Sequence, residues 1–257
     1  MQATTKLHSP PHSSAQVISC EVGPFLVNNV ATPYLPIDIV VWKVKLDLNA
    51  ALSTQIISDL DLVEQARLDR YRRHADRIRF AISRVALKAI IKQHCPEIKT
   101  KPVHFNSGPF GKLFMPSMRL NFNLSHSGSW TYIVLSTRRN GGIDVEQVNS
   151  EVINEDLIRS ALTAQEIKNL PVAPIEDRIK CFYQYWTRKE SALKALGLGI
   201  SYGLQNVTIL PTPRSNWYIA STLATKSAID TELKALTIVS LPVSPGYMAA
   251  LAFGPES

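Results

Sequence analysis

The sequence predicts an α+β fold: a pseudo-dimer of two similar subdomains, each a small, mostly antiparallel sheet packed with a long helix. Short β-branched runs separated by turn residues predict the strands, and two long stretches with apolar residues at helical spacing predict the helices. A faint repeat predicts the two halves, because residues 37–39 resemble 143–145 and residues 86–90 resemble 192–196, both at a spacing of 106. Two short matches can arise by chance, but their shared spacing favours two similar halves.

The elements are expected in the following order. Residues 1–36, rich in Ser, Pro, Thr and His, are expected to form a flexible or loosely packed extension. Pro96 ends the first long helix, Gly197 ends the second, and Asn140-Gly141-Gly142 is a turn signal. The expected strands are 36–42, 103–105, 120–124, 132–136, 143–148, 205–210, 216–222, 235–240 and 247–252, and the expected helices are 55–71, 75–94, 153–170 with a break near 162, and 177–196. The subdomains are therefore 37–140 and 141–257, with the last strand free to return to the first subdomain.

Composition narrows the class of protein. The 257 residues are 45% hydrophobic and 19% charged, which is ordinary for a globular protein and argues against wholesale disorder. The net charge of +7 indicates an anionic partner: nucleic acid, a phosphorylated small molecule or an acidic protein. The three cysteines lack the spacing of a disulfide framework or a zinc site. There is no secretory signal and no run of roughly 18 apolar residues, so a cytoplasmic protein without membrane contact is expected.

Two acids begin the candidate site, Asp144 and Glu146 in the segment 142–146. On a strand they point to the same face, while Ile143 and Val145 face a core. Neighbouring carboxylates repel unless a proton or cation lies between them, and hard oxygen ligands suit Mg²⁺. An exposed strand with two solvated acids would show the same pattern, because Asp-x-Glu is a common sequence.

Two charged residues interrupt the apolar side of the second long helix. Lys189 lies within the stripe and Glu190 lies at its edge, and a charge in an apolar stripe is costly unless it is paired. This indicates that both residues serve a bound partner. A Glu190–Lys194 pair along the helix would explain Glu190 but not Lys189. The stripe consists of Phe182, Tyr185, Trp186, Leu193 and Leu196.

Two further segments carry groups that suit phosphate. In 121–130 a strand runs into small polar residues and His126, although a solvated polar turn explains the segment equally well. Residues 67–92 hold nine bases and two acids, and arginine grips phosphate in a bidentate manner. A solvated helix face explains most of these bases. Lys112, which follows Gly111 in a tight loop, is also within reach of an anion.

Three motifs occur together in a familiar order. With them the chain resembles the Sfp-type 4'-phosphopantetheinyl transferases over about residues 37–252. Each motif alone is weak, but the ordered set is specific. The motifs are Asn123-Leu124-Ser125-His126-Ser127, Gly142-Ile143-Asp144-Val145-Glu146 and Trp186-Thr187-Arg188-Lys189-Glu190-Ser191-Ala192-Leu193-Lys194.

The resemblance implies a fold, a reaction and its partners. The fold is the transferase pseudo-dimer, a monomer with coenzyme A as co-substrate between its halves and Mg²⁺, or Mn²⁺ in its place, as cofactor. The reaction moves the 4'-phosphopantetheine arm of coenzyme A to a serine of an apo acyl carrier protein or peptidyl carrier domain and releases 3',5'-ADP. This is holo-acyl-carrier-protein synthase activity, which serves fatty-acid, polyketide or nonribosomal peptide synthesis.

The resemblance also implies roles for individual residues. Glu190 is expected to be the general base and Lys194 to bind a phosphate and assist the leaving group. Arg79, and less directly Arg67, are expected at the 3'-phosphate, and Lys112 matches the lysine of the family's Gly-Lys-Pro loop. The expected metal ligands are Asp144, Glu146 and Glu190, and the expected co-substrate-binding residues are Arg67, Arg79, Lys112, Ser125, His126, Lys189 and Lys194.

The chain departs from the family pattern at two positions. Leu113 stands where proline usually follows Lys112, and Glu64 stands where a base is frequent. Two other functions use the same residues: a different magnesium-dependent transferase that handles a nucleotide, and a basic nucleic-acid-binding module. The second has no need for Lys189 and Glu190 in an apolar stripe, so no nucleic-acid partner is expected. A pseudoenzyme that only binds coenzyme A is disfavoured by the intact acids.

Overall fold

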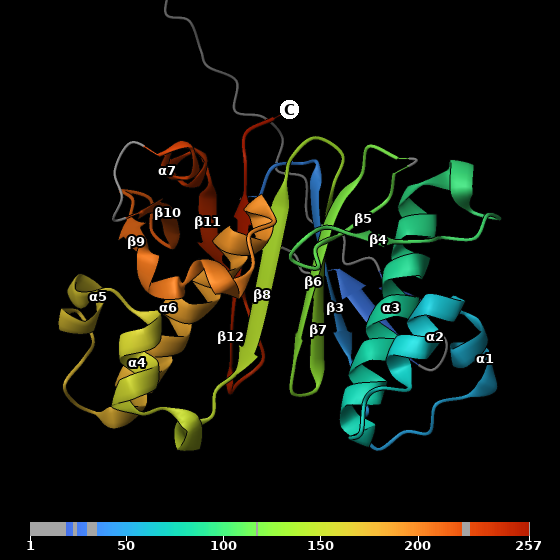
Figure 1. Ribbon diagram of the computed structural model, residues 1–257, viewed down its shortest axis with the longest axis horizontal. Coiled ribbons are helices and arrows are strands. Elements are labelled where there is room, and N and C mark those ends of the chain that lie inside the picture. Colours follow the sequence, from blue (N-terminus) through green and yellow to red (C-terminus); the bar gives the residue numbers. More distant parts are fainter. Residues whose placement is uncertain (1–18, 23–24, 30–34, 117, 223–226, 257) are drawn as a thin grey trace, which may run out of the picture.

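Two antiparallel sheets pack against each other in the middle of the molecule, and one long helix covers the outer side of each (Figure 1). The helices are α3 (His74–His94) and α6 (Ile175–Leu196). This is the α+β pseudo-dimer that the sequence predicts. The computed structural model describes residues 19–22, 25–29, 35–116, 118–222 and 227–256.

The N-terminal sheet has the strand order β1-β2-β3-β7-β6. Its central strand shows why the layers form, because side chains alternate between its faces. Ile39 and Val41 pack toward the second sheet, whereas Trp42 and Val44 join the core beneath α3. The strands are β1 (Ser19–Val22), β2 (Phe25–Asn29), β3 (Ile39–Lys45), β6 (Asn121–Ser127) and β7 (Trp130–Ser136), and the smaller elements of this half are α1 (Thr54–Ser58), α2 (Leu62–Leu68), β4 (Asn106–Ser107) and β5 (Leu113–Phe114).

The C-terminal sheet has the order β8-β12-β11-β10-β9. The apolar stripe predicted on α6 packs on this sheet, with Phe182 and Leu193 buried in its core. The strands are β8 (Gly141–Gln147), β9 (Val207–Pro211), β10 (Trp217–Thr222), β11 (Thr237–Ser240) and β12 (Tyr247–Phe253), and the shorter helices are α4 (Glu155–Ala161), α5 (Ala164–Lys168) and α7 (Ala228–Lys234).

The ends of the chain differ from the sequence prediction. β1 and β2 lie within the segment 1–36, yet they extend the N-terminal sheet beside β3, so these residues do not belong to a loose extension. The rest of that segment up to residue 34 lies outside the described residues. The last strand, β12, pairs with β8 and β11 and stays in the second sheet. Its backbone hydrogen bonds are already used there.

Several local predictions also need correction. The helix expected over 55–71 is two helices, because Asp61 begins α2 with a capping box to Glu64 that the apolar pattern does not reveal. Residues 103–105 form no strand, and the short pair β4–β5 follows them. Helix α7 was not predicted; Ser227 caps its start. The break expected near residue 162 is confirmed by the gap between α4 and α5.

The internal repeat is present, but its register differs from the expected one. The ends of β3 and β8, at Lys45 and Gln147, are 102 residues apart, and so are the ends of α3 and α6. The matches at a spacing of 106 therefore pair residues four positions away from their structural equivalents. At the observed spacing the acids still belong to one half only, because Trp42 and Val44 are the counterparts of Asp144 and Glu146.

The link between the halves is short. Residues 137–140 join β7 to β8, and Arg139 in this link donates to Asp38 Oδ1 at 3.2 Å and to the Gly254 carbonyl at 3.3 Å. These bonds tie the link to the start of β3 and to the end of the chain. The turn expected at Asn140-Gly141-Gly142 is not formed, because both glycines already belong to β8.

Gly142 serves close packing rather than a turn. A Cβ atom built on Gly142 would collide with the Ala195 nitrogen and the Ser191 carbonyl oxygen of α6. Both are backbone atoms, which cannot rotate away. The absence of a side chain therefore lets α6 approach β8 closely, directly beside Asp144.

The substitution Gly142→Ala should destabilise the protein by about 2 kcal/mol or more, because overpacking against backbone forces α6 away from β8. Thermal unfolding followed by circular dichroism measures the loss. Gly141→Ala is the matched control, since its Cβ would lie 3.5 Å from Val134 Cγ1, an ordinary contact. Equal melting temperatures for the two variants would contradict this account.

Candidate active site

The edge strands of the two sheets, β6 and β8, lie side by side and are joined through side chains of β6. Asn123 Oδ1 accepts from the Ile143 nitrogen at 2.9 Å, Ser125 donates to Asp144 Oδ1 at 2.8 Å, and Ser127 donates to Glu146 Oε2 at 2.7 Å. These three residues alternate along β6 and therefore share one face. The Asn-x-Ser-x-Ser pattern thus forms the seam between the halves.

The three acids predicted as metal ligands gather on the α6 side of this seam. Asp144 is 1% exposed, and its Oδ2 has no hydrogen-bond partner among the described residues. Ile143 and Val145 face the core between the sheets, as predicted from the alternation of the strand. Glu190 reaches the same place from α6, where Lys194 bridges it to Asp144 with Nζ distances of 3.3 and 2.6 Å.

The acids disturb one another's titration. Burial, together with the charges of Asp144 and Glu190, raises the pKa of Glu146 to about 7. Burial and Asp144 also raise the pKa of Glu190, against the opposing charge of Lys194. Burial alone would lower the pKa of Lys194, but Asp144 and Glu190 outweigh it and raise that pKa. One ammonium group therefore serves three carboxyl groups, and the cluster has a shortage of positive charge.

The chemistry of this cluster fits a hard divalent cation. Its donors are carboxylate oxygens, one of them buried without a partner, and their repulsion is the kind that a bound cation removes. In the part of the chain that the structure describes, no three such side chains are already placed to enclose a metal. The ammonium of Lys194 bonds to Asp144 and Glu190 instead, so binding of an ion requires these side chains to rotate.

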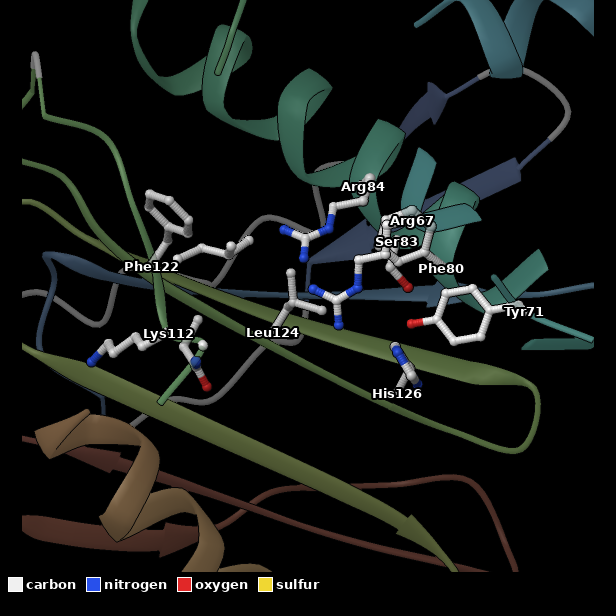
Figure 2. Close-up of a pocket in the computed structure, with 12 residues that line it drawn as sticks. Arg67, Tyr71, Phe80, Ser83, Arg84, Lys112, Phe122, Leu124 and His126 are labelled. Atoms are coloured by element: carbon white, nitrogen blue, oxygen red, sulfur yellow. The ribbon is translucent and has the colours of Figure 1, made fainter. Parts of the chain in front are cut away.

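A basic pocket of about 160 Å³ lies on the other side of β6, against α2 and α3 (Figure 2). Arg67 and Arg84 point into it from these helices, and His126 faces them from β6. His126 alternates with Ser125 along the strand, so β6 presents one face to the acids and the other to the bases. Burial, together with the charges of Lys194 and Arg79, lowers the pKa of His126, which leaves its ring neutral near pH 7.

Arg84 was not among the predicted site residues. It is 9% exposed, it lies over the rings of Phe80 and Phe105, and its Nη1 has no partner among the described residues. The sequence offered one signal: an arginine set in the apolar run from Phe80 to Leu87. The solvated helix face expected for most of these bases does not include Arg84, which is buried and lines the pocket.

Two other predicted bases are held away from the pocket's centre. Arg79 does not line it; its guanidinium donates to the Gly128 carbonyl at 2.9 Å and to Asp76 at 2.7 Å. Lys112 lines the pocket, but its amine points away from the arginines (Figure 2) and donates to the Ala195 carbonyl at 2.8 Å. Burial lowers the pKa of Lys112 to about 8.

Lys189 is not at the seam, and its assignment to the co-substrate is corrected. The side chain is fully buried on the far side of α6, where it pairs with Glu166. Its Nζ also donates to the carbonyls of Ala161 at 2.8 Å and Leu204 at 3.1 Å. Lys189 therefore links α6 to the α4–α5 region. The partner that a charge in the apolar stripe requires is Glu166 of the same protein.

Two further bases of 67–92 are engaged within the protein. Lys88 is buried and pairs with Glu64, and Arg77 donates to the Leu68 carbonyl at 2.9 Å. Arg70, Arg72 and Arg73, between α2 and α3, are exposed. None of the described helices is both long and apolar enough to traverse a lipid bilayer.

Comparison with known proteins agrees with this geometry. A family model described as the 4'-phosphopantetheinyl transferase superfamily matches residues 141–251, and one described as 4'-phosphopantetheinyl transferase, N-terminal, matches residues 49–138. HetI, a 4'-phosphopantetheinyl transferase of Nostoc sp., is 30% identical over 176 residues, which cover 67% of this chain and 73% of HetI. The chain belongs to the 4'-phosphopantetheinyl transferase family.

Two other relatives match shorter parts of this transferase-family chain. A putative 4'-phosphopantetheinyl transferase of Synechocystis sp. is 35% identical over 147 residues, 56% of this chain and 59% of that protein. Sfp, a 4'-phosphopantetheinyl transferase of Bacillus subtilis, is 24% identical over 141 residues, 54% of this chain and 61% of Sfp. In both comparisons the chain spans less than two thirds of the relative's length. The two family models divide the chain at the link between the subdomains.

The raised pKa of Glu146 predicts a pH-dependent stability. A carboxyl group whose pKa is raised on folding favours the folded state at low pH, and this contribution is lost as pH rises from about 4.5 to about 7. In metal-free buffer, Glu146→Gln should therefore raise the melting temperature more at pH 8 than at pH 5. Glu151→Gln, on an exposed residue beyond β8, is the control and should show no such difference. An equal shift at both pH values would contradict the raised pKa of Glu146.

Proposed function

We propose that this protein transfers the 4'-phosphopantetheine arm of coenzyme A to a serine of an apo carrier protein. The observation that supports this most is the pairing of an acid cluster with a basic pocket on opposite faces of one strand, β6. An elongated co-substrate with phosphates at separate positions needs both kinds of group. Membership of the transferase family supports the same reaction.

In this proposal Asp144, Glu146 and Glu190 hold Mg²⁺, for which Mn²⁺ can substitute. The ion, when bound, would neutralise charge on the pyrophosphate of coenzyme A. Lys194 is partly exposed at the seam and sits beside these acids, so its ammonium is placed to bind a phosphate and to stabilise charge on the departing 3',5'-ADP. Ser125 orients Asp144 through its hydrogen bond.

Glu190 is the proposed general base. The serine hydroxyl attacks the β-phosphate, its proton passes to Glu190, and the bond to 3',5'-ADP breaks. The raised pKa of Glu190 brings the carboxylate closer to the range in which a base accepts a proton at neutral pH. Because one chain supplies both sides of the seam, we propose that the active form is a monomer that acts as a holo-acyl-carrier-protein synthase.

Glu190→Gln should lower transfer about 100-fold or more, because the amide cannot accept the serine proton. The test incubates purified protein with coenzyme A, Mg²⁺ and an apo carrier protein and follows, by mass spectrometry, the gain of one phosphopantetheine. Glu176→Gln, an exposed glutamate at the start of the same helix, is the control and should transfer normally. Normal transfer by the Glu190 variant, or no transfer by the unaltered protein with any of several carriers, would refute the proposal.

Mg²⁺ at 100 times its Kd should raise the melting temperature of the unaltered protein by several degrees. Binding at this concentration stabilises the folded state by about 2.7 kcal/mol. Asp144→Asn should remove this effect while the variant remains folded in the presence of a chelator. Asp177→Asn, on an exposed residue of α6, should retain the effect. A magnesium response that survives in the Asp144 variant would place the ion elsewhere. This readout does not depend on transfer.

A further inference from the structure

A tight turn joins β6 to β7 at the end of the seam where Glu146 lies. Ser127 pairs with Trp130, so the loop consists of Gly128 and Ser129. The φ angle of Gly128 is 53°, and a glycine with positive φ suits the first position of a two-residue hairpin loop. Because Ser127 is the last residue of β6, the placement of this β6–β7 turn decides where the Ser127 hydroxyl group lies.

The first half of the chain holds the β6–β7 turn through two carbonyl groups. Arg79 of α3 donates to the Gly128 carbonyl at 2.9 Å. The Leu46 nitrogen, directly after β3, donates to the Ser129 carbonyl at 2.8 Å. Both bonds stay within the N-terminal subdomain, so they fix the turn relative to α3 and β3 but not relative to the strand that carries the acids.

Tyr247 reaches the β6–β7 turn from the second half. It begins β12, where it pairs with Gln147 of β8, and its side chain packs against the core between the sheets. Its hydroxyl oxygen accepts from the Ser129 nitrogen at 3.0 Å. A Cβ atom on Gly128 would collide with Tyr247 Oη and Gln147 Oε1, so the glycine allows this close approach. Tyr247 therefore fixes the turn relative to β8.

The orientation of Glu146 depends on this turn. Ser127 donates to Glu146 Oε2 at 2.7 Å, and its own oxygen accepts from the Gln147 nitrogen at 3.0 Å. No other described residue donates a hydrogen bond to the Glu146 carboxyl group. Asp144 differs, because both Ser125 and Lys194 donate to it. A small shift of the turn would thus release Glu146 while Asp144 stays in place.

We infer that Tyr247 is a positioning residue for Glu146: it holds the β6–β7 turn against β8, so that the Ser127 hydroxyl group orients the carboxylate for magnesium. The inference rests on the proposed function, in which Tyr247 touches neither the ion nor the co-substrate. Hydrogen bonds to a metal ligand from outside the coordination sphere set its orientation, and their loss typically weakens metal binding about 10- to 100-fold.

The test measures magnesium affinity and not transfer. Melting temperatures recorded over a series of Mg²⁺ concentrations give an apparent Kd for the ion. Ser127→Ala should weaken magnesium binding about 10-fold or more. Tyr247→Phe removes only a hydroxyl group and should weaken it about 5-fold, the size expected for one hydrogen bond. Tyr218→Phe is the matched control, because its hydroxyl group accepts from Arg188 at 3.0 Å and not from the turn, and it should keep the affinity.

A double variant separates positioning from a general loss of stability. If Tyr247 acts through Ser127, then Ser127→Ala/Tyr247→Phe should bind magnesium no more weakly than Ser127→Ala alone. Independent losses that multiply in the double variant would overturn the inference. So would a Tyr247→Phe variant that melts earlier in chelator but keeps its magnesium affinity, since that result means a structural role only. Absence of any magnesium response in the unaltered protein would overturn it as well.

This outcome is separable from the outcome of the transfer assay. A protein that loses magnesium affinity in Tyr247→Phe but modifies no carrier would uphold the positioning role and refute the proposed transfer. A protein that transfers phosphopantetheine while Tyr247→Phe keeps its full magnesium affinity would refute only the role of Tyr247.

Discussion

The contact between β6 and β8 determines how everything else in the molecule is placed. Two sheet edges usually meet, if at all, through backbone hydrogen bonds, and an open edge invites pairing with another chain. Here short polar side chains of β6 reach across instead, and two of the groups that they bind are Asp144 and Glu146. The same hydrogen bonds therefore join the halves and orient the acids. Structural and chemical roles cannot be separated at Ser125 and Ser127.

Among the described residues, the charges on both faces of β6 are incompletely paired. Asp144 and Glu190 share the ammonium of Lys194, with Glu146 beside them, while on the other face of β6 the Nη1 of Arg84 lacks an acceptor. Each arrangement costs free energy in the isolated protein, because buried charge without a partner is unfavourable. Both costs fall if one ligand brings a cation to the first place and an anion to the second. Under the proposed function, the two unsatisfied sites would favour a magnesium-bound, multiply phosphorylated molecule over either component alone.

Much of this could be predicted from sequence, because it follows from periodicity. The period of two placed Asp144 and Glu146 on one face, and the helical period identified the stripe on α6. Periodicity does not name partners, however. It could not show that Lys189 pairs with Glu166, since Glu166 lies on α5 and Lys189 on α6 and the two meet only in the folded chain. Nor could it place Arg84 at a pocket, because its burial depends on Phe105, outside α3, as well as on Phe80 of the same helix.

The brief connection of residues 137–140 has a consequence for how strong the seam must be. A tether of a few residues holds its two ends at an effective concentration that reaches the millimolar range, so the halves meet without a binding free energy of their own. A few hydrogen bonds and one apolar interface are then sufficient to hold the two halves together. If the chain were cut at this tether, assembly of the site would become a bimolecular event, and dilution alone would dismantle it. The covalent link therefore replaces a binding affinity between the two halves. The contact between β6 and β8 can consequently consist of polar side chains.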